Sequence, residues 1–79
     1  MEHTRNLIGE TEDFKYFTLQ RQGSEGNTIF GVGILENEKS FEGYYFTEDE
    51  QFATSLCKQM FDGGVTITTL PYIIDDAVA

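Results

Sequence analysis

Three stretches of the chain are rich in β-branched and aromatic residues, at residues 14–21, 28–35 and 40–46. Such stretches are typical of β-strands. The segment at 22–27 contains two glycines, and residues 37–38 are Asn-Glu. Glycine and asparagine tolerate the positive φ angles of tight turns, so both connections are short enough to join neighbouring strands. The pattern therefore predicts an antiparallel meander of three strands.

The first thirteen residues are mostly polar, and Leu7 and Ile8 are their only adjacent apolar pair. Chain termini with few apolar residues order poorly unless another element holds them. We expect residues 1–13 to form a mobile N-terminal arm, or at most one weak edge strand.

After residue 46 the apolar residues recur at intervals of three and four, which predicts an amphipathic helix. Thr47 and Glu50 have the spacing of a capping box, in which each side chain binds the backbone N–H of the other residue. The helix is expected to run to about Phe61, and the Asp-Gly-Gly sequence at 62–64 supplies a glycine for its C-cap. The apolar stripe of this helix consists of Phe52, Ala53, Leu56, Cys57, Met60 and Phe61.

Residues 65–68 (Val-Thr-Ile-Thr) predict a short extended segment. Thr68 or Thr69 can begin a last helix, because Pro71 is tolerated in a first helical turn. Its apolar face consists of Leu70, Ile73, Ile74 and Ala77. We therefore expect one α+β domain over residues 14–79, a three-stranded antiparallel meander with two helices packed on one face, in the order β-β-β-α-(β)-α.

The chain has 79 residues, of which seven are Phe and four are Tyr. One domain of this size is near the lower limit for a self-sufficient core, so a homodimer is an open alternative. Cys57 is the only cysteine, which excludes an intramolecular disulfide. Residues 1–6 lack the apolar core of a secretion signal, and no apolar run approaches the roughly 20 residues of a membrane span. We expect a cytoplasmic protein that binds no membrane.

The formal net charge is −9, from 14 acidic and 5 basic residues. Such a surface repels phosphate backbones, so no nucleic acid is expected as a partner. Lys15, Arg21 and Lys39 are the only basic residues in the predicted sheet and its turns, and they make no basic patch. Residues 36–79 hold nine of the acids and two of the bases, which places an electrostatic function in the C-terminal half.

The sequence predicts no catalytic residue, no cofactor and no metal site. His3, the single histidine, has no convergent partners for a metal, and we expect a solvated terminal side chain. Cys57 lies on the apolar stripe of the first helix, where a thiol behaves as a small hydrophobic group. The acids at 48–50 are explained by the helix dipole. Asp75 and Asp76 are either solvated or in contact with a partner.

Gly31 and Gly33 alternate along the second strand, which indicates a bulge or a close backbone approach before it indicates a ligand pocket. A dinucleotide fingerprint would require a third glycine at Glu36. The aromatic cluster at 44–46 is able to stack bases, but the cationic surround of such a site is missing, so we assign the cluster to the core.

Residues 16–35, and especially the segment from Val65 to Asp76 (VTITTLPYIIDD), resemble a small family of bacterial proteins of uncharacterised function, found mainly in clostridia-like Firmicutes. The resemblance implies a meander, a helix, a short link and a terminal helix with an apolar-apolar-acid-acid end. It implies a bacterial cytosolic protein and no active site to carry over. Where the family has proline and histidine in the link, this chain has Ile67 and Thr69.

These observations favour a non-enzymatic protein-interaction or regulatory module with an acidic surface. It would bind an unknown protein partner through the acidic C-terminal half or an exposed strand edge. A small-molecule-binding domain or small enzyme is the first alternative, motivated by the Gly31 and Gly33 face. An anionic mimic of nucleic acid is the second, motivated by the net charge and expected to carry its carboxylates in a regular double row.

Overall fold

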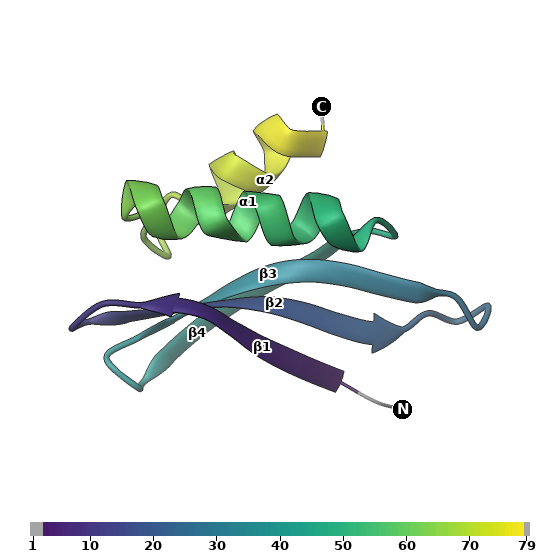
Figure 1. Ribbon diagram of the computed structural model, residues 1–79, viewed down its shortest axis with the longest axis horizontal. Helices are drawn as coiled ribbons and strands as arrows, with labels where there is room; N and C mark the ends of the chain where they lie inside the picture. Colours follow the sequence, from purple (N-terminus) through teal and green to yellow (C-terminus); the bar gives the residue numbers. More distant parts are fainter. Residues whose placement is uncertain (1–2, 79) are drawn as a thin grey trace.

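The computed structural model describes residues 3–78, which form a four-stranded antiparallel sheet with two helices on one of its faces (Figure 1). The elements are β1 (His3–Glu10), β2 (Phe14–Gln22), β3 (Thr28–Glu36), β4 (Ser40–Thr47), α1 (Glu50–Gly63) and α2 (Leu70–Val78). The strands lie in chain order, so every pair is joined by a short connection. The α+β class, the antiparallel meander and the two helices are confirmed.

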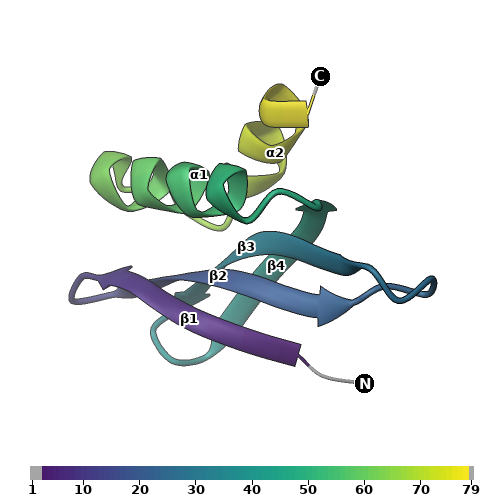
Figure 2. The same cartoon turned by 45° about the vertical axis from the view of Figure 1, so that its right-hand side comes forward.

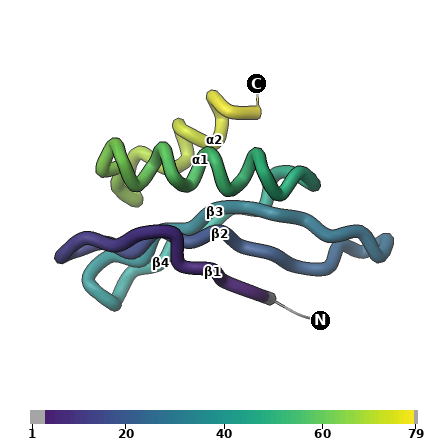
Figure 3. The backbone as a smooth tube through the Cα atoms, in the orientation of Figure 1, coloured from purple at the N-terminus to yellow at the C-terminus, as the bar shows by residue number. Residues whose placement is uncertain are grey.

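The prediction of three strands was wrong, because residues 3–10 form a fourth strand at the edge of the sheet. β1 pairs with β2 from His3 opposite Arg21 to Glu10 opposite Lys15. The register shifts between Leu7 and Gly9, and Figure 3 shows this bulge as a step in the path of β1. An edge strand gains its stability mainly from backbone hydrogen bonds, so its side chains give a weak sequence pattern.

The turn between β3 and β4 follows the prediction. Asn37 and Glu38 both have positive φ angles, of 54° and 59°, and the N–H of Lys39 donates to the carbonyl of Glu36 over 3.0 Å. Positive φ at both central residues matches the right-handed twist of the flanking strands. The register of the last two strands is fixed by this turn.

Helix α1 begins later than the predicted capping box. The N-cap is Asp49, whose carboxylate accepts from the N–H groups of Gln51 and Phe52 at 3.0 and 3.3 Å. Thr47 is still the last residue of β4, opposite Phe30, and cannot also cap the helix. The C-cap glycine is confirmed, because Gly64 has a φ of 66° and its N–H reaches back to the last helical carbonyls.

The segment between the helices is a turn, so the predicted short extended segment at 65–68 is wrong. The carbonyl of Thr66 accepts from the N–H groups of Thr69 and Leu70, which curls the chain directly into α2. This segment lies on the helix side of the sheet, where Tyr16 binds it, and therefore has no strand to pair with.

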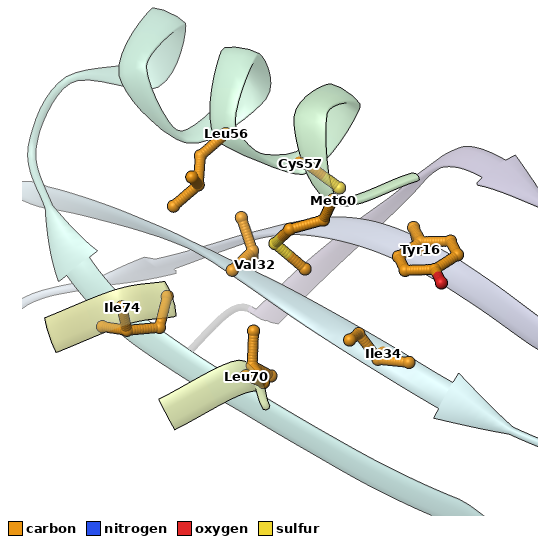
Figure 4. Packing of buried hydrophobic residues seen from close by; sticks show 8 residues of the cluster. All are labelled: Tyr16, Val32, Ile34, Leu56, Cys57, Met60, Leu70 and Ile74. Atoms are coloured by element: carbon orange, nitrogen blue, oxygen red, sulfur yellow. The ribbon is translucent and has the colours of Figure 1, made fainter. Parts of the chain in front are cut away.

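The core lies between the sheet and the two helices (Figure 4). α1 contacts all four strands, and α2 contacts β4. The buried cluster consists of Tyr16, Val32 and Ile34 from the sheet, Leu56, Cys57 and Met60 from α1, and Leu70 and Ile74 from α2. The apolar faces predicted for both helices are confirmed, except that Phe52 is 37% exposed.

Tyr16 joins the three parts of the core. Its side chain is fully buried, its ring meets the ring of Phe61 edge-on at 5.8 Å, and its hydroxyl donates to the carbonyl of Val65 over 2.7 Å. Val65 directly follows the left-handed cap of α1. The bond therefore holds the turn from which α2 starts against β2, a central strand of the sheet.

Replacing Tyr16 by Phe will keep the ring and leave the Val65 carbonyl without its donor. We expect the free energy of unfolding to fall by about 1 to 2 kcal/mol, measured by urea denaturation. Tyr72→Phe is the control, since Tyr72 is 72% exposed and its replacement is expected to leave stability unchanged. Equal stability of the two variants would contradict a structural role for the Tyr16 hydroxyl.

Candidate functional site

The sheet face that points away from the helices is not covered by any described part of the chain (Figures 1 and 2). We call it the open face. Side chains alternate between the two faces of a strand, so the neighbours of buried Tyr16, Val32 and Ile34 point to the open face. The register arranges them in cross-strand rows: Arg5, Leu19, Gly31 and Tyr45; Leu7, Phe17, Gly33 and Gly43; and Glu10, Lys15, Leu35 and Phe41. Arg21 and Ile29 form a further row at one end.

A guanidinium lies over aromatic rings on this face. The Cζ atom of Arg5 is 4.2 Å from the ring centroid of Phe41 and 5.7 Å from that of Phe17. The two rings meet edge-on at 6.3 Å. A guanidinium above a ring is attracted to the ring's negative face and keeps N–H donors for a further partner. β1, β2 and β4 thus build one cationic and aromatic cluster.

A second guanidinium–aromatic pair lies at the end of the open face where β4 finishes. The Cζ atom of Arg21 is 4.8 Å from the ring centroid of Tyr45. Both residues border an open surface hollow of about 350 Å³, whose other lining residues are Ile29, Phe46, Thr47 and Glu48. The hollow is shallow rather than enclosed, so it suits one side chain of a larger partner better than a buried small molecule.

Neither arginine is neutralised by a carboxylate among the described side chains. The ion pair of the sheet joins Lys15 to Glu38 at 2.7 Å, and this pair raises the pKa of the Lys15 amine. Arg21 reaches the carbonyl of Gln22 at 3.4 Å, and Arg5 contacts the two phenylalanine rings. Both guanidinium groups therefore retain capacity for carboxylate oxygens.

The glycines of the open face serve packing, as their spacing predicted. A Cβ atom at Gly31 would lie 1.8 Å from the carbonyl oxygen of Tyr44, at the point where the β3–β4 register shifts. A Cβ atom at Gly33 would lie 2.6 Å from the ring of Phe41. The glycines are covered by backbone and by an aromatic ring, and they do not border the hollow near Arg21.

Acidic residues surround the open face at both ends of the strands. One end carries the acids of the β1–β2 and β3–β4 turns, at residues 10–13 and 36–38. The other end carries Glu25 and the acids at 48–50, and Asn27 donates a hydrogen bond to Glu48 there. These carboxylates belong to turns and a helix start on several elements. That placement differs from the regular double row expected of a nucleic-acid mimic.

The remaining candidates from the sequence lie elsewhere. Cys57 is fully buried in the core, and this burial raises the pKa of its thiol to about 12. Asp75 and Asp76 are exposed on α2. Tyr44 and Phe46 pack against the core, as predicted for the aromatic cluster, while Tyr45 lies on the open face. The side chain of His3 is outside the described part of the structure.

Within residues 3–78 no three His, Cys, Asp or Glu side chains come together as they would around a metal ion. The cluster of Arg5, Phe17 and Phe41 was not predicted from the sequence. The one local sequence signal for this cluster is on β2, where alternate residues give the strand a second, partly apolar face. These residues are Lys15, Phe17, Leu19 and Arg21. Arg5 and Phe41 lie 36 positions apart, and only the sheet brings them together.

Replacing Gly31 by Ala will force the new methyl group into the Tyr44 carbonyl. We expect a loss of about 2 kcal/mol or more in the free energy of unfolding, since backbone cannot move aside as a flexible side chain does. Gly63→Ala is the matched control, because no atom lies within 4 Å of the added carbon and alanine favours the helix. Urea denaturation of both variants tests this, and a neutral Gly31→Ala would contradict the close approach.

The buried thiol makes stability depend on pH. The folded-state pKa of Cys57, about 12, lies above its ordinary value of 9.0. Stability is therefore unaffected below pH 9 and is lost as the pH rises toward 12, by about 1.4 kcal/mol per pH unit. Cys57→Ala removes this proton; burial, the larger cause of the raised pKa of Tyr16, acts in both proteins, and the smaller contribution of the Cys57 thiolate is lost with the thiol. We expect the stability difference between wild type and Cys57→Ala to change from pH 9 to 11 by this slope; parallel profiles would contradict it.

No described helix has the length and apolar character of a membrane span. Comparison of the chain with protein-family models, with curated proteins and with solved structures finds no match. The resemblance to the clostridial family stays a hypothesis from the sequence.

Proposed function

We propose that this protein is a non-enzymatic protein-interaction module with an acidic surface, and that it binds its partner through the open face of the sheet. The observation that carries the proposal is the uncovered cluster of Arg5, Phe17 and Phe41. Arginine and aromatic residues are the types that contribute most to binding at protein interfaces. Leu7, in the neighbouring row, is 49% exposed.

The two layers of the protein differ in chemistry. The helix side uses its apolar residues to build the core, and its exposed positions are largely polar or acidic, such as Asp75 and Asp76. The open face combines apolar side chains with cations, and its residues are rigidly spaced by the pairing of four strands. A rigid, preformed surface loses little conformational entropy on association. This arrangement supports binding more than chemistry, since catalysis requires groups that converge in a cleft.

The first test compares wild type with Leu7→Glu as bait for proteins of the source cell. We expect specific partners on wild type and their loss, by at least about tenfold, on Leu7→Glu, because a carboxylate at a desolvated contact is costly. Val78→Glu is the matched control: Val78 is 53% exposed on α2, and the chemical change is identical.

One control and two outcomes decide how this test is interpreted. Both variants must keep the wild-type circular dichroism spectrum, so that loss of capture reports the surface. Retention of every partner by Leu7→Glu would place the binding site off the open face. Turnover of a metabolite by the protein, with no partner captured, would favour a small enzyme over an interaction module.

A further inference from the structure

We infer that the open face binds a segment of a partner protein that carries carboxylates between apolar side chains in its centre and neutral or basic residues at its ends. This inference rests on the proposed function and adds the chemistry of the partner. It follows from three features: two arginines that no described carboxylate pairs with, exposed apolar groups on the same face, and acids at both ends of the strands.

The arginines indicate the carboxylates of the segment, which would lie between the acids of the two strand ends and nearer the end where Arg21 and Glu48 line one hollow. The chain has 14 acidic residues for 5 basic ones, yet no described carboxylate pairs with Arg5 or Arg21. Lys39 and Lys58 also have no ion pair among the described residues, so what distinguishes the two arginines is their place on the open face. Both guanidinium groups are held over rings, Arg5 at 4.2 Å from Phe41 and Arg21 at 4.8 Å from Tyr45. A guanidinium fixed in this way presents its N–H fork to a carboxylate.

The apolar groups indicate what separates those carboxylates. Leu7 is 49% exposed, and Phe17 and Phe41 are partly exposed beside the Arg5 guanidinium. Aromatic or aliphatic side chains of the partner would cover these groups and remove water from the arginine–carboxylate contacts. Removal of water strengthens such contacts, because the local dielectric falls.

The acids at the strand ends indicate the flanks of the segment. A segment lying along the strands reaches the acids at 10–13 and 36–38 at one end, and Glu25 and the acids at 48–50 at the other. Carboxylates in the flanks would be repelled there, while lysine, arginine or neutral residues would not. The charge pattern of the face is therefore acidic, cationic, acidic along the strands, and the partner requires the complement.

Two other occupants fit this pattern less well. A nucleic acid carries a negative charge at every nucleotide, so a strand crossing the face would meet the acids at both ends. A second copy packed face to face would offer Arg5 and Arg21 one carboxylate, that of Glu10, among the described strand residues that point to this face. A partner protein can confine its carboxylates to the centre.

Two synthetic peptides of identical composition test the inference. The first peptide has a central stretch in which glutamates alternate with phenylalanines, and lysines at both ends. In the second peptide the lysines and the glutamates exchange places and the phenylalanines stay in the centre. Binding is measured by fluorescence anisotropy at about 0.15 M salt. At this salt concentration, electrostatic interactions between exposed charges are screened beyond roughly 8 Å. We expect the first peptide to bind at least about tenfold more tightly, since charged hydrogen bonds of this kind change affinity by that factor.

Variants assign the binding to the arginines. Arg5→Gln and Arg21→Gln are each expected to weaken the first peptide by about tenfold. Lys58→Gln is the control, because Lys58 is exposed on α1 and the change in net charge is the same; its effect should stay within about twofold. Amide resonances of Gly33 and Gly43, which lie on the open face, should shift on addition of the peptide.

Four outcomes would overturn the inference. They are equal binding of the two peptides, unchanged binding by the arginine variants, tighter binding of single-stranded oligothymidylate to the same face, and self-association of wild type that Leu7→Glu abolishes. If cellular partners depend on Leu7 while the peptides fail, the proposed function stands and only the partner chemistry is wrong. If both fail, the proposed function fails with it.

Discussion

The fold depends on burying Tyr16 without leaving its hydroxyl unpaired. The ring of Tyr16 lies on the central strand β2, fully removed from solvent, and its hydroxyl would cost about 1 to 3 kcal/mol if it were buried without a partner. The carbonyl of Val65 meets that requirement at 2.7 Å. Since Val65 follows the C-cap of α1 and precedes α2, this hydrogen bond ties the turn between the two helices to β2.

This constraint also explains why one face of the sheet stays open. Both helices follow the last strand, and the Tyr16 bond draws the turn between them onto the same face. Residues 3–78 contain no third helix for the other face. That face therefore keeps its own side chains for packing: Phe41 lies over Gly33, and Arg5 lies over Phe41. The proposed function depends on this asymmetry, because a covered face would have no arginine–aromatic cluster to offer a partner.

Much of the fold was predictable because its signals are local. The strands at 14–22, 28–36 and 40–47 have β-branched and aromatic residues between turn residues, and both helices have apolar residues on one side. The errors share a cause. β1 gains backbone pairing more than side-chain burial, the true N-cap Asp49 depends on where β4 ends, and the turn at 65–69 depends on Tyr16, 49 positions away from Val65. Each was decided by a contact that no local pattern records.

The sequence by itself determined the α+β class, the order of the helices after the meander, the burial of Cys57 and the excess of negative charge, because these follow from composition and from periodicity within single elements. Only the tertiary structure decided which surface the arginine side chains share with the aromatic rings. The pairing of β1 with β2 and of β3 with β4 places Arg5, Phe17 and Phe41 together and moves the acids to the ends of the strands. A net charge is a sum over the whole chain, whereas a binding surface is a local arrangement of side chains. The sheet register decides that arrangement, because it sets which residues of different strands lie side by side on one face.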